Sequence, residues 1–141
     1  MATDADKKIF GSTLVPAGTY LIADATNSDE VTTINNQEMK YVKLSLNLAH
    51  FNNEGKPTGK AGSISLNGCW RPRRGSDGKA YQAGGSFYTE LLKACQGKSF
   101  EETAQYITNT FKDKKVKVDY LRYPLADTNG FGNLPIINFV D

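Results

Sequence analysis

The sequence predicts a single, mainly β domain in which a helical segment interrupts the strands. Several stretches alternate apolar and polar residues with the period of two that is typical of a half-buried strand, and one later stretch places apolar residues at helical spacing. A chain of 141 residues with 39% hydrophobic and 23% charged residues has the size and composition of one globular domain. We expect a flexible N-terminal segment over residues 1–13 and one folded domain over residues 14–141.

Three strands are expected in the first half of the domain. The first is Gly18–Thr26, and the polar stretch 27–38 separates it from the second, Met39–Leu48, which alternates most clearly. Its two faces carry Val42, Leu44, Leu46 and Leu48 on one side and Tyr41, Lys43, Ser45 and Asn47 on the other. After the turn-rich connection Phe51–Gly62, the stretch Ser63–Trp70 alternates again, and we expect it to pair antiparallel with the second strand.

Two helices are expected next. Ser86 is interpreted as the N-cap of the first, which ends before Gly97, and Ser99 with Glu102 forms an SxxE capping box that opens the second. The apolar positions at helical spacing are Tyr88, Leu91, Leu92 and Cys95 in the first helix, and Phe100, Ala104, Ile107 and Phe111 in the second.

Two further strands complete the domain. Lys114–Pro124 returns to period two, and the stretch 134–141 closes the chain after the loop 125–133. The order of five strands, with large connections between strands one and two, two and three, and four and five, matches the OB-fold. This fold is a five-stranded Greek-key barrel, here with the helical segment between strands three and four. A small β-sandwich with an inserted helical hairpin is the alternative.

Motifs of catalysis and cofactor binding are missing from the sequence. No GxxxxGK[ST] or GxGxxG loop follows a strand, no GxSxG elbow occurs, and Cys69 and Cys95 lack CxxC spacing, so we expect buried or inert thiols and no metal or cofactor. We therefore expect no enzyme; the rival needs the single His50 or a carboxylate in an unforeseen pocket. No apolar run approaches the roughly 18 residues of a membrane span, and we expect a cytoplasmic protein without membrane contact.

Basic side chains gather in the middle of the chain, where residues 54–81 carry six Lys or Arg against two acids. Sequence-tolerant binding of single-stranded nucleic acid needs cations that follow the phosphates and flat rings on which bases stack, each ring contributing about 1 to 3 kcal/mol. The candidate nucleic-acid-binding residues are Tyr41, Lys43, Lys56, Lys60, Trp70, Arg71, Arg73, Arg74, Lys79 and Tyr81.

Each of these candidates also has a structural interpretation. Tyr41 can cover neighbouring apolar surface, and the arginines can belong to a solvated turn, although the planar, forked donors of Arg suit phosphate. Trp70 shares the parity of Ile64 and Leu66 and would face the core in an uninterrupted strand. A bulge at Gly68 would turn Trp70 to the binding side instead, so its facing stays open.

The chain resembles small phage-encoded single-stranded DNA-binding proteins of OB type. The resemblance lies in VPAGTYLIADAT, in YVKLSLNL with a GK-rich connection after it, in FYTELLKACQGKSF and in KKVKVDYL, which together span residues 14–140. It implies a protein that coats single-stranded DNA in replication or recombination, in the host cytoplasm, without metal or cofactor; DNA versus RNA preference stays open.

One feature departs from that family. Many of its members end in a flexible acidic tail that recruits partners, whereas this chain ends in INFVD, which we interpret as strand. Replication proteins and further copies of the chain therefore stay open as partners. The alternative function is that of a phage protein-interaction or virion module without nucleic-acid binding.

Overall fold

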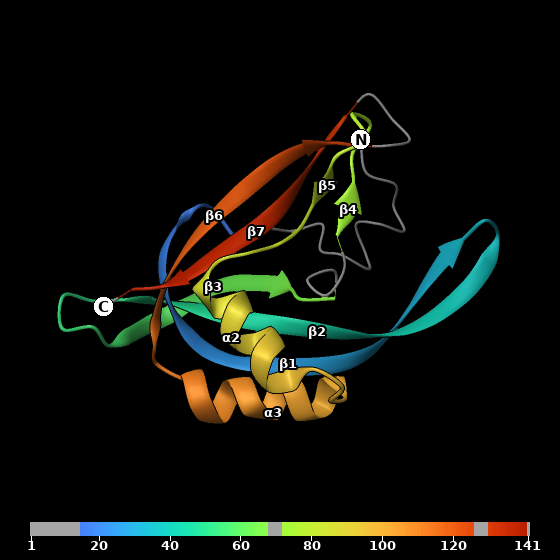
Figure 1. Ribbon diagram of the computed structural model, residues 1–141. Coiled ribbons are helices and arrows are strands. Elements are labelled where there is room, and N and C mark those ends of the chain that lie inside the picture. Colours follow the sequence, from blue (N-terminus) through green and yellow to red (C-terminus); the bar gives the residue numbers. More distant parts are fainter. Residues whose placement is uncertain (1–14, 68–71, 126–129, 141) are drawn as a thin grey trace.

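The computed structural model describes residues 15–67, 72–125 and 130–140, and this part of the chain is mainly β (Figure 1). The expected flexible segment 1–13 lies outside it. The strands are β1 (Gly18–Ile34), β2 (Gln37–Phe51), β3 (Pro57–Ser65), β4 (Arg73–Arg74), β5 (Ala80–Tyr81), β6 (Lys115–Pro124) and β7 (Phe131–Phe139). The helices α2 (Ser86–Cys95) and α3 (Phe100–Phe111) lie between β5 and β6, so the predicted helical segment between the third long strand and the fourth is confirmed.

The five long strands form one antiparallel sheet in the order β3-β2-β1-β6-β7. In this order β6 returns by a long connection to lie beside β1, which is the arrangement of a Greek key. The predicted antiparallel pairing of the second and third strands is confirmed, because Ser45 pairs with Ser65 and Leu46 with Ile64.

The closed barrel expected from the sequence is not formed, because residues 84–86 occupy the free edge of β7. Gly84 makes a parallel bridge with Ile136, and the Gly84 carbonyl accepts a hydrogen bond of 2.9 Å from Ile137 N–H. The Ser86 hydroxyl accepts one of 2.8 Å from Phe139 N–H. In the described residues β3 and β7 therefore do not pair with each other, and the sheet stays open.

The core lies where the two halves of the sheet meet the helices. The predicted alternation of β2 is confirmed, since Leu44, Leu46 and Leu48 are fully buried, as are Ile64 and Leu66. The predicted helical stripes face this core except at Leu92, which is half-buried outside it, and Phe100 is only partly buried against it. Its helical members are Phe87, Tyr88, Leu91 and Cys95 of α2 and Ala104, Ile107 and Phe111 of α3.

The predicted N-terminal cap is confirmed for α3 and wrong for α2. The capping box is present in α3: the Ser99 hydroxyl accepts from Glu102 N–H at 3.1 Å, and the Glu102 carboxylate accepts from Ser99 N–H at 3.4 Å. The prediction of Ser86 as N-cap is wrong, because Gly85 precedes α2 and Ser86 is its first residue. The Ser86 hydroxyl instead accepts the hydrogen bond from Phe139 N–H of β7.

The prediction of a large connection between the first two strands is also wrong. β1 continues to Ile34, β2 begins at Gln37, and only Asn35 and Asn36 join them, with φ of 51° and 64°. Two successive positive φ values are the signature of a type I′ turn, whose twist suits a hairpin. We call residues 27–42 the arm. It projects from the body of the molecule, with its tip at the right of Figure 1.

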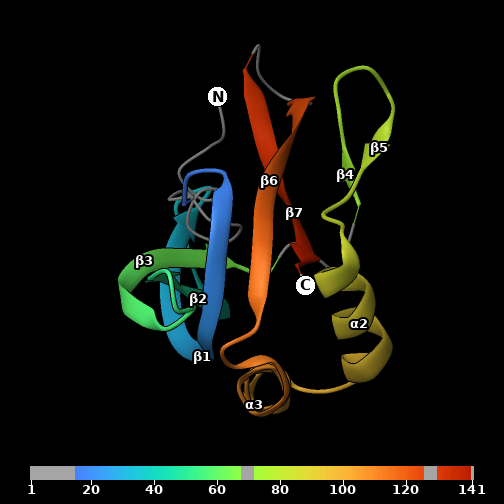
Figure 2. The same cartoon turned by 90° about the vertical axis from the view of Figure 1, so that its left-hand side faces the viewer.

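A short hairpin, β4–β5, completes the fold. Its Tyr81 ring stacks on the Tyr123 ring of β6, with 5.5 Å between the ring centroids, and packs against a small cluster formed by Tyr123, Leu125 and Leu134. Figure 2 shows this hairpin on the far side of β6 and β7 from β1, β2 and β3.

Replacing Gly85 should be costly, because this glycine lets residues 84–86 approach β7. Its φ is 103°, and a Cβ atom there would lie 2.1 Å from the Ile137 carbonyl oxygen. We expect Gly85→Ala to lower the free energy of unfolding by about 2 to 3 kcal/mol in urea denaturation.

Gly59→Ala is the matched control, since no atom lies within 4 Å of a Cβ at that position. It should change the free energy of unfolding by no more than about 0.5 kcal/mol. Equal stability of the two variants would contradict the role given to Gly85.

Candidate nucleic-acid interface

The alternation that buries Leu44, Leu46 and Leu48 turns the intervening side chains of β2 away from the core. Residues paired across an antiparallel ladder share a face, so the strand register identifies their neighbours. We call this surface the outer face. Its members are Asp24, Thr26, Ser28 and Glu30 of β1, Tyr41, Lys43, Ser45 and Asn47 of β2, and Ser63 and Ser65 of β3.

The middle of the outer face is a hydrogen-bonded polar strip. The Asn47 amide donates to the Asp24 carboxylate at 2.7 Å and to the Thr26 hydroxyl at 3.2 Å, and its carbonyl accepts from the Ser63 hydroxyl at 2.5 Å. Beside this strip lies an open hollow of about 440 Å³, and Lys60 lies on its rim with Asp24 and Asn47. The strip is therefore polar, ordered and accessible next to a cation.

Tyr41 and Lys43 lie at the arm end of the outer face, and both are half-buried. Burial, and secondarily the neighbouring Glu30 carboxylate, raises the pKa of Tyr41 above its ordinary value. The phenol therefore stays neutral at physiological pH and offers a flat, uncharged ring beside a cation. Glu30 opposes the attraction of Lys43 for an anion at the same place.

Lys56 and Lys60 lie at the opposite end of β2. Lys56 is exposed in the turn between β2 and β3, and Lys60 is exposed on β3, where it pairs with Ala49. Ala49 lies eight positions after Tyr41 on β2, which corresponds to about 26 Å along an extended strand. The outer face thus has the Tyr41 ring and Lys43 at one end, Lys60 borders its other end, and Lys56 lies in the turn beyond.

The remaining described candidates are on the β4–β5 hairpin. Arg74 is exposed and donates to the Gly78 carbonyl at 3.0 Å, Arg73 pairs in register with Tyr81, and Lys79 is exposed. The Tyr81 hydroxyl donates to the Asp77 carboxylate, and this bond, together with that from Lys79 N–H, lowers the pKa of Asp77. One face of the Tyr81 ring is covered by Tyr123.

The structure does not bring all the candidates into one groove. The hairpin lies beyond β6 and β7, whereas Tyr41 and Lys43 are on β2, so the cations form two separate groups (Figure 2). Trp70 and Arg71, and Gly68 on which the facing of Trp70 depends, lie outside the described residues.

A further aromatic and cationic pair, which sequence reasoning missed, lies where β6 ends and β7 begins. The Arg122 guanidinium carbon is 3.9 Å from the centroid of the Phe131 ring, and 53% of Phe131 is exposed. The pair spans two strands, so the signal appears only once Pro124 is known to pair with Phe131. The sequence predicts a loop over residues 125–133, whereas β7 already begins at Phe131.

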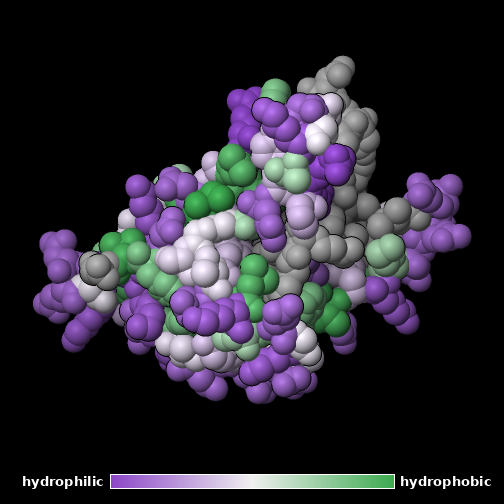
Figure 3. Space-filling model, in the orientation of Figure 1, coloured by the Kyte–Doolittle hydropathy of each residue, from purple (hydrophilic) through white to green (hydrophobic). Residues whose placement is uncertain are grey.

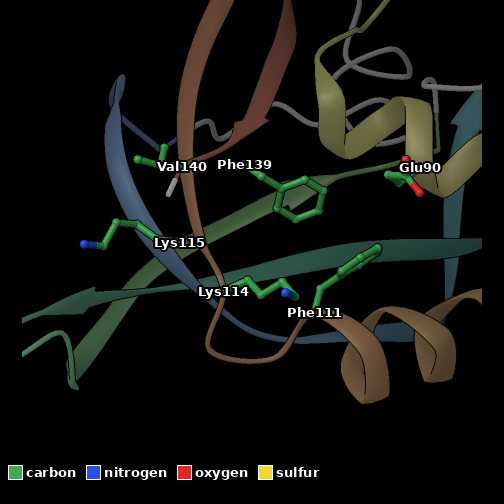
Figure 4. A pocket seen from close by; sticks show the side chains of 6 residues that line it. All are labelled: Glu90, Phe111, Lys114, Lys115, Phe139 and Val140. Atoms are coloured by element: carbon green, nitrogen blue, oxygen red, sulfur yellow. The ribbon is translucent and has the colours of Figure 1, made fainter.

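A second hollow, of about 390 Å³, lies between the helices and β6–β7. Figure 4 shows the rings of Phe111 and Phe139 between Glu90 and Lys114. These rings lie 5.1 Å apart and both contact Phe87, so they form the edge of the core. Glu90 lies on one side of this hollow and Lys114 and Lys115 lie on the other, so its charged lining is of mixed sign.

Other kinds of site find little support in the described residues. They contain no group of three or more His, Cys, Asp or Glu side chains that could hold a metal ion. Cys95 is buried as predicted, and burial raises the pKa of its thiol. His50 is exposed, with its ring 5.7 Å from that of Tyr20. No helix in residues 15–67, 72–125 and 130–140 is long and apolar enough to cross a membrane.

Comparison with protein-family models, with curated proteins and with solved structures found no match to this chain. A function for the chain therefore depends on the chemistry of its own side chains.

Proposed function

We propose that the protein is a non-catalytic, sequence-tolerant single-stranded DNA-binding protein that acts in replication or recombination. The observation that carries this proposal is the outer face, where the Tyr41 ring and Lys43 lie at one end, while Lys60 of β3 borders the other end and Lys56 lies in the turn beyond it. A ring stacks on any base, and a lysine attracts any phosphate, so this chemistry binds a strand without reading its sequence.

The strand order supports an open relative of the OB-fold. OB-folds bind oligonucleotides on the face of their second and third strands and with the loops that join strands one and two and strands four and five. In this chain those loops correspond to the arm and to the β6–β7 tip, which carries Arg122 and Phe131. The arm and the β6–β7 tip both join strands of the sheet whose outer face carries Tyr41.

The dimensions agree with a short binding site. About 26 Å of β2 corresponds to about eight nucleotides at the roughly 3.4 Å spacing of a stacked strand, within the 4 to 16 nucleotides bound by one OB-fold. The cations Arg73, Arg74 and Lys79 on the β4–β5 hairpin form a second group that a longer strand would reach. Stacking and phosphate contacts bind RNA as well, so only a direct comparison of affinities for single-stranded DNA and RNA distinguishes these two ligands.

A protein-interaction or virion module without nucleic-acid binding is the second candidate. The observation that favours it is the arm, which is exposed along most of its length and mostly hydrophilic at its tip (Figure 3). Light scattering with and without oligonucleotide distinguishes the two functions. A large assembly whose mass does not change when oligonucleotide is added would favour the protein-interaction or virion module.

Binding of a labelled oligothymidine should weaken as salt rises, because displaced counterions return to the strand, and each phosphate contact adds about 0.7 to the slope of log K against log[salt]. Lys43→Ala and Lys60→Ala should each lower this slope by about that amount in fluorescence anisotropy titrations.

Lys93→Ala is the control, because Lys93 is exposed on α2, away from the outer face. It should leave the slope unchanged. Undetectable binding at low salt, or an affinity independent of salt, would contradict the proposed function.

Two variants of Tyr41 isolate the contribution of ring stacking to oligonucleotide binding. Tyr41→Leu keeps an apolar side chain at this position but removes the ring, and should weaken oligonucleotide binding by about 5- to 150-fold, the equivalent of about 1 to 3 kcal/mol. Tyr41→Phe keeps the ring and should bind nearly as the wild type does. Equal affinities of the two variants, with unchanged thermal unfolding, would mean that Tyr41 only covers apolar surface.

A further inference from the structure

Within the part of the chain that the structure describes, the arm has an open strand edge on β2. β3 pairs with β2 only from Ser45 onwards, and just beyond it the Asn67 side chain closes the edge. Its carbonyl accepts from Leu44 N–H at 2.8 Å, and its amide donates to the Val42 carbonyl at 2.7 Å. From Gln37 to Lys40, no strand among the described residues pairs with β2 on this side.

The backbone groups on this edge belong to alternate residues. Leu44 N–H and C=O and Val42 C=O all point toward the β3 side, since they bond to Leu66 and Asn67. Because antiparallel strands alternate the direction of these groups, Glu38 and Lys40 present their N–H and C=O on the same edge. Both side chains are exposed, and Met39 between them is 43% exposed.

We propose that this edge pairs antiparallel with the same edge of a second copy of the chain, about a two-fold axis through Met39. Only residues that present backbone groups on the edge can pair by hydrogen bonds, which leaves three central registers. A centre at Glu38 opposes two glutamates, and a centre at Lys40 opposes two lysines. The centre at Met39 instead places Glu38 opposite Lys40 of the other copy, twice.

Charge complementarity therefore selects one register. Opposite charges directly across a ladder stabilise the pairing and like charges destabilise it. Lysine on an exposed edge normally prevents edge-to-edge pairing, but here each Lys40 meets an acid in the Met39 register alone. The open edge of β1 runs through Asn27, Asp29 and Val31 and has no cation, so it offers no such complement.

The pairing also stabilises the arm. A two-stranded ribbon in water is marginally stable, and joining two arms gives a continuous four-stranded ribbon with four added backbone hydrogen bonds. This dimer goes beyond the proposed function and does not depend on it. Its two-fold axis is perpendicular to the ribbon, so the outer faces of the two arms point to the same side.

Charge exchange tests the register. In sedimentation equilibrium the wild type should be dimeric, and Glu38→Lys or Lys40→Glu should each weaken dimerisation at least about tenfold, because each opposes like charges twice. The double variant should dimerise again. A mixture of the two single variants should form heterodimers, because both of its cross-copy pairs are then oppositely charged.

Lys112→Glu, on the exposed residue after α3, controls for net charge and should leave dimerisation unchanged. Far-UV circular dichroism should show that all these variants fold, because the exchanged side chains are exposed. A monomeric wild type, single variants that still dimerise, or a double variant that does not recover would each overturn the proposal.

A cross-link tests the position of the axis. Met39 faces itself in a non-hydrogen-bonded pair, where Cα atoms lie about 4.5 Å apart, which a disulfide can span. Met39→Cys should therefore form an oxidised dimer, identified by mass spectrometry as a bond between the two introduced thiols. Gln37→Cys should not, because residue 37 lies opposite Tyr41. Equal cross-linking at both positions would overturn the register.

Discussion

The side-chain alternation of β2 determines most of this structure. Leu44, Leu46 and Leu48 are at most 1% exposed, and each contributes about 1.5 to 3 kcal/mol by its burial. A slip of one residue would move all three to the solvent, so the facing of β2 is strongly specified. Because β2 pairs with both β1 and β3, its register also determines which of their side chains face outward. The outward position of Tyr41 and Lys43 is a consequence of this constraint.

A second constraint acts at the other end of the sheet. Residues 84–86 bond to the edge of β7 and connect it directly to the start of α2, so β3 is not its neighbour. In residues 15–67, 72–125 and 130–140 the sheet therefore stays open, and the pairing of β1 with β6 covers Gly18–Leu21. The outer face and the β4–β5 hairpin consequently lie apart, and the described cations Lys56, Lys60, Arg73, Arg74 and Lys79 are divided between two surfaces.

The sequence predicted those parts of the fold that have one buried face or a local cap. The alternation in β2 and the Ser99 and Glu102 capping box both report directly on structure within a few residues. The part of the arm over residues 27–38 was missed because it is mostly exposed, so its residues show no alternation of apolar and polar side chains. The open sheet was missed because the contact of Gly84 with Ile136 joins positions far apart in the chain. The pair Arg122 and Phe131 was missed for the same reason.

Photochemical cross-linking measures most directly whether the outer face binds a single strand. Oligothymidine bound to the wild-type protein would be irradiated with ultraviolet light and the modified residues located by mass spectrometry. Binding on the outer face predicts cross-links concentrated at Tyr41, with a second group at Phe131. Cross-links confined to α2 and α3, or to Tyr81 without Tyr41, would contradict it, as would their absence when binding is measured in the same solution.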